Sequence, residues 1–271
     1  MSLAPAVAGS HFSFENVAVA VVMVAVAVGL SRWRRLDLER DIVVASIRAF
    51  VQLMAIGYVI DLIFRSRSAL AVLAMLAAMI GFAAFTSAQR FKGLPRRYVI
   101  ALASIGLSSL TTLGLMVALG IISRDARYLI PIGGMVIGNS MNVASVTGVR
   151  LMEDTRTQRA LIETALALGA SPRQAAQSVL RRAVRLALIP TIDSTKTMGI
   201  VFLPGAMTGM IIAGAKPLDA VRLQVVLMDM LLTAVAVTAV TVGLLVVGSL
   251  FTAEQQVRPV GEAAGAGGRA G

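Results

Sequence analysis

Long apolar segments separated by short polar loops fill most of the chain. Each long segment approaches the length of about 20 residues that a helix needs to cross the hydrocarbon core of a bilayer. Strands of a membrane barrel would instead alternate apolar and polar residues over about 10 positions, and that pattern is absent. The pattern therefore predicts an all-α, polytopic membrane bundle of about seven transmembrane helices, at 14–31, 42–64, 69–89, 98–122, 128–149, 197–214 and 221–249.

These segments belong to one membrane-spanning domain, which we place at residues 14–250. A short N-terminal segment at 1–13 is expected to be flexible. The tail at 251–271 is rich in Gly and Ala and is expected to be disordered. Residues 150–190 interrupt the apolar pattern between the fifth and sixth spans, and their charged, amphipathic character places them outside the membrane.

The distribution of basic residues predicts the orientation. Most of the 25 Lys and Arg residues lie after the first, third and fifth spans and in the tail. Because short cytoplasmic loops carry an excess of Lys and Arg, we expect the N-terminus outside and residues 150–190 in the cytoplasm. The first span precedes its basic cluster, which is the reverse of a cleaved signal peptide, so it is read as an uncleaved span.

Within the cytoplasmic region, the stretch Glu163–Gln174 has the pattern of two helices joined by a turn, and we call it the elbow. Gly169 can end the first helix, because Gly adopts the left-handed conformation at low cost. Ser171 can cap the second helix, with Pro172 at its first position. Two roles fit the elbow: it contacts a partner protein, or it is a linker that lies on the membrane surface. One helical face is formed by Leu161, Ile162, Ala165, Leu166 and Leu168.

The fifth and sixth spans are rich in Gly and Pro. Gly134 with Gly138, and Gly205 with Gly209, form GxxxG pairs that allow helices to approach closely. Pro204 removes a backbone hydrogen bond, and the carbonyl that it frees needs a partner or a cavity. Two readings stay open: a hinged pair of helices that line a pathway, or tight packing alone.

Polar side chains inside or beside the spans are candidates for a translocation pathway or gate. Asp229 in the seventh span is the most informative, because a carboxylate at the bilayer centre costs about 2.5–3.5 kcal/mol on insertion scales. We expect it to face the bundle interior or a wet cavity, where it would bind a cation or be neutralised by a buried donor. Six methionines could offer thioethers to a soft metal ion or be core filler: Met135, Met141, Met207, Met210, Met228 and Met230. The other candidates are Arg48, Gln52, Asn139, Asn142, Asp193, Lys196 and Gln224.

Composition excludes several kinds of chemistry. The chain is 57% hydrophobic, has no Cys and has one His, so thiolate sites and His-rich metal clusters are excluded. The formal charge is +11, but the basic residues lie in short loops without interleaved aromatics, which does not indicate nucleic-acid binding. No phosphate-binding GxxxxGK[ST] motif is present, so a nucleotide that drives this protein would be bound by another chain.

The motifs resemble a known family. The elbow residues Glu163, Ala165, Leu168, Gly169, Ala170 and Ser171 are similar to the EAA coupling loop of ABC transporter permeases. The motifs from about residue 40 to 230 resemble the FetB-type iron-export permeases, to which plant aluminium-tolerance permeases are similar. They are Arg48-x-x-x-Gln52-Leu53, Pro131-Ile-x-Gly134-Met135, Gly138-Asn139, Ile189-Pro190-x-Ile192-Asp193-Ser194-x-Lys196-Thr197 and Leu203-Pro204-Gly205-x-Met207-Thr208-Gly209.

The resemblance implies a permease without its own catalytic site that works as a homodimer with two separate ATPase chains. ATP and Mg would be bound by the ATPase, which the elbow would contact, and iron or a related metal ion would be exported. Alternatives are an ABC permease for a small organic solute, a secondary carrier driven by an ion gradient, and a membrane scaffold without transport.

Overall fold

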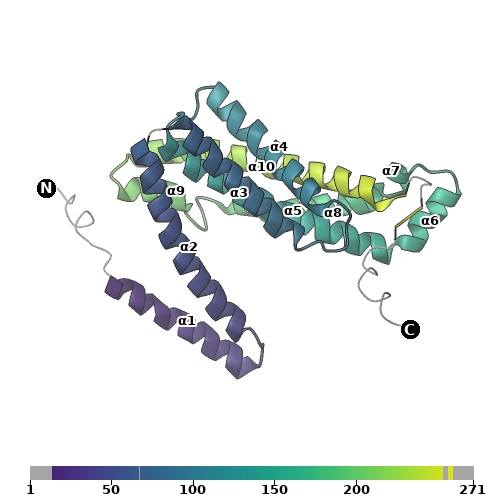
Figure 1. Cartoon of the computed structure of the whole chain (residues 1–271), viewed down its shortest axis with the longest axis horizontal. Coiled ribbons are helices and arrows are strands. Elements are labelled where there is room, and N and C mark those ends of the chain that lie inside the picture. Colours follow the sequence, from purple (N-terminus) through teal and green to yellow (C-terminus); the bar gives the residue numbers. More distant parts are fainter. Residues whose placement is uncertain (1–13, 67, 253–255, 259–271) are drawn as a thin grey trace. The chain divides into compact units, whose positions relative to one another are not determined.

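A computed structural model describes residues 14–66, 68–252 and 256–258, with the backbone alone for 14–20 and Ser66. In these ranges the chain forms ten helices and no β-sheet (Figure 1). The all-α class and the polytopic helical architecture are thereby confirmed. The predicted flexible N-terminus at 1–13 and most of the predicted tail lie outside the described residues.

The chain divides into two compact units, 1–68 with 212–214 and 69–211 with 215–271. Among the described residues, five helices are long and apolar enough to cross a membrane: α2, α3, α4, α5 and α10. The helices are α1 (Phe14–Arg34), α2 (Glu39–Ser66), α3 (Ala69–Ala88), α4 (Arg97–Ala118), α5 (Ala126–Thr157), α6 (Arg159–Ala167), α7 (Pro172–Ala175), α8 (Gln177–Thr197), α9 (Gly205–Ile212) and α10 (Pro217–Leu250).

The first unit is built on the hairpin of α1 and α2, and Ser31 fixes its turn. The Ser31 hydroxyl accepts from the backbone N–H of Leu38 at 3.2 Å and donates to the Glu39 carboxylate at 3.1 Å. The most apolar stretch of α2 has no buried residue. An apolar helix exposed in this way requires lipid or another protein surface around it.

The second unit is a bundle in which α5 packs against α3, α4, α8 and α10. α10 also packs against α4 and α8, so α5 and α10 form the centre. At 1.5 Å per residue, α5 with 32 residues is about 48 Å long, which exceeds the thickness of the hydrocarbon core. The predicted fifth span at 128–149 is therefore part of a helix that continues out of the membrane.

The helix α4 buries small polar residues beside apolar ones such as Ile105, and its outward face carries large apolar residues. Ser104, Ser108 and Thr112 are buried, whereas Leu107 and Leu110 are exposed. This is the reverse of a water-soluble helix and is expected in lipid, where small residues allow close packing and polar side chains hydrogen-bond between helices. It agrees with a helix that lies in a membrane.

Ser108 connects three helices. Its hydroxyl donates to the carbonyl of Ala234 in α10 at 2.7 Å and lies 3.2 Å from the Ser140 hydroxyl of α5. Thr238 donates to the same carbonyl at 2.8 Å. Hydrogen bonds of this kind fix the register of α4, α5 and α10 where apolar contact alone would permit sliding.

The predicted sixth span at 197–214 is not one helix, and that expectation was wrong. Residue 197 ends α8, an irregular segment follows at 198–204, and α9 has only 8 residues. Eight residues rise about 12 Å, far less than the roughly 30 Å that a span needs. The apolar composition of this stretch reflects a broken segment between helices.

The packed part of the chain continues beyond the predicted boundary at residue 250. Phe251 and Val257 are both buried and pair through an isolated bridge. Arg258 donates from its backbone to the Leu250 carbonyl at 2.8 Å. These contacts attach residues 251–252 and 256–258 to the end of α10, although the sequence had assigned them to the tail.

The tightest packing at glycines occurs at Gly133, Gly148 and Gly243, none of which belongs to a predicted GxxxG pair. A Cβ atom at Gly148 of α5 would lie 2.6 Å from Phe91, whose side chain is 1% exposed. By contrast, Gly138, Gly205 and Gly209 have nothing within 4 Å of an added Cβ. Within this chain the predicted GxxxG pairs are therefore not sites of close approach, apart from Gly134 beside Met79.

We expect Gly148→Ala to destabilise the bundle by about 1–3 kcal/mol, because the new methyl group must displace the buried Phe91 ring. The matched control is Gly138→Ala on the same helix, which meets no atom. It should be neutral or stabilise by about 0.5–1 kcal/mol through the helix preference of Ala. Thermal unfolding of both variants in detergent measures the difference, and equal midpoints would contradict the expectation.

Candidate functional site

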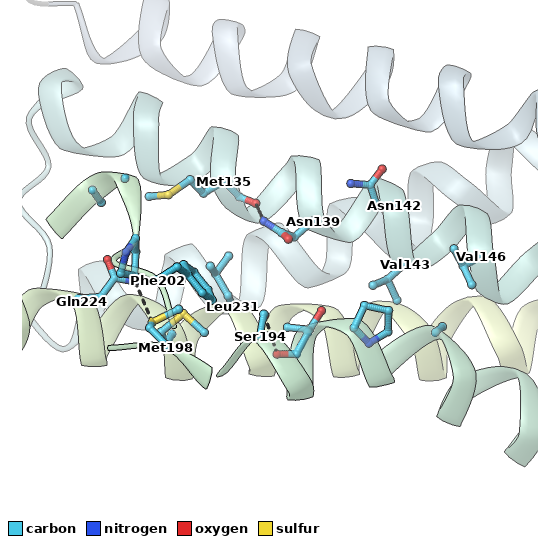
Figure 2. A pocket seen from close by; sticks show the side chains of 17 residues that line it. Met135, Asn139, Asn142, Val143, Val146, Ser194, Met198, Phe202, Gln224 and Leu231 are labelled. Carbon is cyan, nitrogen blue, oxygen red and sulfur yellow. Dashed lines mark hydrogen bonds between the residues drawn. The ribbon is translucent and has the colours of Figure 1, made fainter. Parts of the chain in front are cut away.

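A cavity of about 450 Å³ lies within the second unit, between α5, α8 and α10. The irregular segment after α8 and the first residues of α9 close it on one side (Figure 2). Its rim includes the exposed side chains of Asn142, Val146 and Phe202, so the cavity opens to the surface of the unit. A volume of this size accommodates an ion or a small solute.

The α5 wall consists of residues spaced at one helical face. The Asn139 side chain donates to the Met135 carbonyl at 2.8 Å, which fixes its position on the helix. Asn139 is thus held by its own helix, while Asn142 extends from an exposed position (Figure 2). The wall residues are Met135, Asn139, Asn142, Val143 and Val146.

The α8 wall is shaped by Pro190, which lies inside the helix and has no N–H to donate. One turn later, the hydroxyls of Ser194 and Thr195 both donate to the Thr191 carbonyl, at 3.0 and 2.7 Å. Such side-chain bonds to the preceding turn bend helices slightly. Thr191 and Ser194 contribute hydroxyl-bearing residues to the cavity lining.

The segment that follows α8 makes a tight turn. Gly199 has φ of 80°, a conformation that favours glycine, and its N–H donates to the Phe202 carbonyl at 2.9 Å. The chain then enters α9 at Gly205, and the Pro204 carbonyl accepts from the N–H and hydroxyl of Thr208. Pro204 therefore starts a helix, whereas the sequence had suggested that it interrupts one.

The third wall is formed by Gln224, Met228 and Leu231 of α10. Gln224 is 8% exposed, and its amide N–H lies 3.8 Å from the Met198 sulfur. Its Oε1 atom is buried without a hydrogen-bond partner. A buried acceptor in that condition costs about 1–3 kcal/mol.

The structure brings together only part of the predicted pathway. Arg48 and Gln52 belong to the first unit, where both are exposed. Asp193 and Lys196 form an exposed ion pair at 3.2 Å on α8. Neither of them lines the cavity, and neither do Gly134, Gly138, Gly209 and Met207. The predicted residues that do line it are Met135, Asn139, Asn142, Pro204, Gly205 and Gln224.

The sequence predicted that Asp229 faces the bundle interior or a wet cavity, and this prediction was wrong for this chain. It is exposed on α10, whereas its neighbours Met228 and Met230 are buried. The helix turns by about 100° per residue, so Asp229 points away from the face that carries Gln224. Within this chain it is therefore not part of the cavity.

The cavity also contains residues that the pathway prediction missed, chiefly Met198, Thr191 and Ser194, and it contains Met228, which the sequence had named only as a possible thioether ligand. The helical spacing of Gln224, Met228 and Leu231 marks one face of α10 and could have identified Met228. No comparable signal was available for Met198, because it lies in the turn after α8 and tertiary packing brings it there.

The elbow has the predicted local geometry. Gly169 has φ of 88°, and Ser171 and Gln174 form a reciprocal capping box with Pro172 at the start of α7. The prediction that one apolar helical face is buried is wrong in part. Ile162 is 1% exposed and anchors α6, whereas Leu161 and Leu168 are 63% and 83% exposed.

The residues assigned to ATPase coupling lie mostly on the elbow surface. Glu163 pairs with Arg159 at 2.7 Å on α6. Leu168, Gly169 and Ser171 are exposed, and the two remaining residues, Ala165 and Ala170, are partly buried. The elbow therefore presents an apolar tip, Leu168, on a rigid turn.

The helix α8 joins the elbow to the cavity. It begins at Gln177, directly after α7, and its last turns line the cavity with Thr191 and Ser194. In Figure 1, α6 and α7 lie at one end of the second unit and α9 lies toward the other. One continuous element of 21 residues, about 31 Å long, thus connects the two sites.

Comparison with known proteins gives a consistent result. A model of the family described as "Uncharacterised protein family (UPF0014)" matches residues 14–251. The chain is 46% identical over 209 residues to the UPF0014 membrane protein STAR2 of Oryza sativa subsp. japonica, a match that covers 77% of this chain and 73% of the relative.

Two further relatives carry descriptive names. The chain is 43% identical over 211 residues to Protein ALUMINUM SENSITIVE 3 of Arabidopsis thaliana, covering 78% of this chain and 77% of that protein. It is 35% identical over 213 residues to the Probable iron export permease protein FetB of Escherichia coli (strain K12), covering 79% and 82%. No solved structure matches the chain with comparable significance. Together with the apolar helices, these matches identify a multi-pass membrane protein.

The absence of Cys makes the water access of the cavity directly measurable. We expect Ser194→Cys, at the cavity wall, to react with a small charged thiol reagent at least about tenfold faster than Ser140→Cys, because a fully buried thiol is not accessible to the reagent. Ser140 is fully buried and provides the matched control. Equal labelling rates in membranes would contradict a water-filled cavity.

Proposed function

Because the chain belongs to the UPF0014 family of membrane proteins, we propose that it is the membrane-spanning permease subunit of an ABC transporter. The proposed substrate is iron or a related metal ion, moved out of the cell across the inner membrane. The proposal draws on the relative named as a probable iron export permease. The observation that carries the coupling to an ATPase is the continuous path from the elbow to the cavity along α8.

The elbow supports contact with a second protein. Its tip, Leu168, is 83% exposed, and a large apolar side chain on a rigid turn is a typical interface anchor. Ile162 at the base of α6 is buried in the core of the second unit. A partner that binds the tip would therefore displace packed helices, since the base cannot move independently.

Displacement of the elbow would reach the cavity through two helices. α8 runs from α7 to the turn at Met198, and α5 carries Met135 at the cavity and ends at Thr157, directly before α6. Both helices line the cavity and pack against each other. ATP-driven closure of the partner pair would thus alter the cavity walls and alternate its access between the two sides of the membrane.

The assembly we propose contains two copies of this chain and two ATPase chains. ATP and Mg are bound by the ATPase, and this chain contributes no nucleotide site. The exposed apolar helix α2 and the exposed Asp229 of α10 are consistent with surfaces that a second copy covers. An unpaired carboxylate in lipid is costly, and cover by protein removes that cost.

A second candidate is a permease of the same type for a small organic solute. The cavity volume of about 450 Å³ favours it, because sites for small molecules occupy about 300–1,000 Å³. Transport measurements in vesicles with radioactive iron and with a panel of solutes separate the two candidates, since only the true substrate accumulates in an ATP-dependent manner.

The proposed coupling is tested at Gly169 with a co-purified ATP-binding-cassette chain. We expect Gly169→Arg to abolish stimulation of ATP hydrolysis by the permease while membrane insertion stays intact. A Cβ atom at Gly169 meets no atom of this chain, although the φ of 88° strains any L side chain, and the rest of the Arg side chain would occupy the partner's groove. Gly169→Asn is the matched control, because Asn tolerates φ of 88° and is small, and it should retain most of the stimulation.

A second variant distinguishes loss of coupling from misfolding of the turn. Leu168→Asp changes only an exposed side chain, so the fold should be unaffected, and co-purification with the ATPase should fall by about tenfold or more. Unchanged stimulation and unchanged co-purification in both variants would refute the coupling role of the elbow.

A further inference from the structure

We propose that the outer surface where α3 meets α4 binds one anionic phospholipid of the membrane leaflet on the elbow side, with the lipid phosphate at Arg97. The proposed site consists of the Phe85 and Tyr98 rings, the Arg97 guanidinium and the apolar face that continues from them along both helices. None of these residues lines the cavity. The inference therefore goes beyond the proposed function and does not depend on which substrate is transported.

The connection between α3 and α4 lies at a membrane surface. Both helices are long and apolar enough to cross a membrane, and only residues 89–96 join them. Phe91 and Leu94 of this loop are buried in the same core as Ile162 of α6 and Ala176, which follows α7. The loop is therefore at the elbow end of the second unit, at the level of the lipid headgroups.

The loop and the first residue of α4 carry positive charge without a compensating acid. Residues 89–97 contain no Asp or Glu. Within the described residues, no carboxylate forms an ion pair with any of their four basic side chains. Each Lys or Arg near an anionic membrane surface strengthens attraction to it by about fivefold. The four basic residues are Arg90, Lys92, Arg96 and Arg97.

Arg97 differs from the other three because aromatic rings fix its position. Its guanidinium carbon lies 4.9 Å from the centroid of the Tyr98 ring, and its Nη2 donates to the Tyr98 hydroxyl at 3.3 Å. The Tyr98 ring in turn stacks on Phe85 of α3, with the ring centroids 5.9 Å apart. A guanidinium has five N–H donors, and Tyr98 accepts one of them. The other donors are suited to bind a phosphate through paired hydrogen bonds.

An exposed apolar face continues from the rings toward the middle of the membrane. Phe82 lies about one turn before Phe85 on α3, and Leu102 lies about one turn after Tyr98 on α4. Phe82 is 55% exposed and Leu102 is 49% exposed. Because α3 and α4 pack against each other and the rings stack between them, Phe82 and Leu102 lie on the same side of the pair. An acyl chain along this face would begin beside the phosphate at Arg97.

The combination of charge and apolar surface favours a lipid over other anions. A free phosphate would use the cations alone and would gain nothing from the face at Phe82 and Leu102. A lipid uses both, since its phosphate lies at the membrane surface and its acyl chains lie against the spans. The rings occupy the depth at which Tyr and Trp are enriched in membrane proteins.

Binding of defined lipids to the purified full-length protein in detergent tests the inference without any ATPase. Phosphatidylglycerol is the probe, and phosphatidylcholine with the same acyl chains is the comparison, because the two differ in net charge. We expect phosphatidylglycerol to bind at least about tenfold more tightly, as measured by titration with fluorescent lipid.

Three substitutions separate the charge from the aromatic platform. Arg97→Gln should weaken phosphatidylglycerol binding by about fivefold or more. Tyr98→Leu removes no charge but removes the ring that holds Arg97, and it should weaken binding by about threefold or more. Tyr98→Phe keeps the ring and should retain most of the binding.

Arg124→Gln is the matched control, since Arg124 is exposed and lies beyond the opposite end of α4. It removes the same charge and should bind phosphatidylglycerol as the unaltered chain does. An equal loss in Arg124→Gln and Arg97→Gln would show attraction by net charge alone and would overturn the inference.

Three further results would also overturn it: equal affinity for the two lipids, unchanged binding in Tyr98→Leu, or displacement of the lipid by millimolar inorganic phosphate. The last result would assign the site to a free anion. None of these measurements involves ATP hydrolysis or transport, so failure of this inference is distinguishable from failure of the proposed function.

Discussion

The constraint that organises this molecule is that backbone polar groups inside a bilayer must find partners within the protein. Irregular backbone at membrane depth is tolerated only where it is buried or lines a cavity. The segment 198–204 is irregular, and it meets the constraint through the hydrogen bonds of its own turn and by its place at the cavity. The bundle of α4, α5 and α10, joined through Ser108, provides the fixed frame against which this broken segment lies.

In the proposed transporter, the elbow and the cavity are two ends of one mechanical system. The elbow combines an exposed tip with a buried base, so force on Leu168 is passed to packed helices. α8 then connects that base to the wall that carries Thr191 and Ser194. This arrangement explains how a chain that contributes no nucleotide site in the proposed assembly could use the energy of ATP.

Sequence patterns predicted the long helices well, because a membrane span imposes both length and apolar composition on α2, α3, α4, α5 and α10. They also predicted the turn at Gly169 and the cap at Ser171, since these depend on neighbouring residues only. They failed at 197–214, where apolar composition does not distinguish a span from a broken segment. They failed again at Asp229, although its offset from Gln224 and Met228 already places it on another face of α10. Met198 could not have been assigned, because its position depends on how α8 packs against α10.

Pro190 gives α8 unequal stiffness along its length. Its ring leaves the carbonyl one turn earlier without the usual intrahelical donor, so the helix can flex there without breaking a hydrogen bond. In the proposed transporter, the half of α8 nearest the elbow would move as a rod, and the half that ends at Thr197 would pivot against it at Pro190. A small translation at the elbow end of α8 would there be converted into rotation at the cavity, and the angle of that rotation would be governed by a single ring.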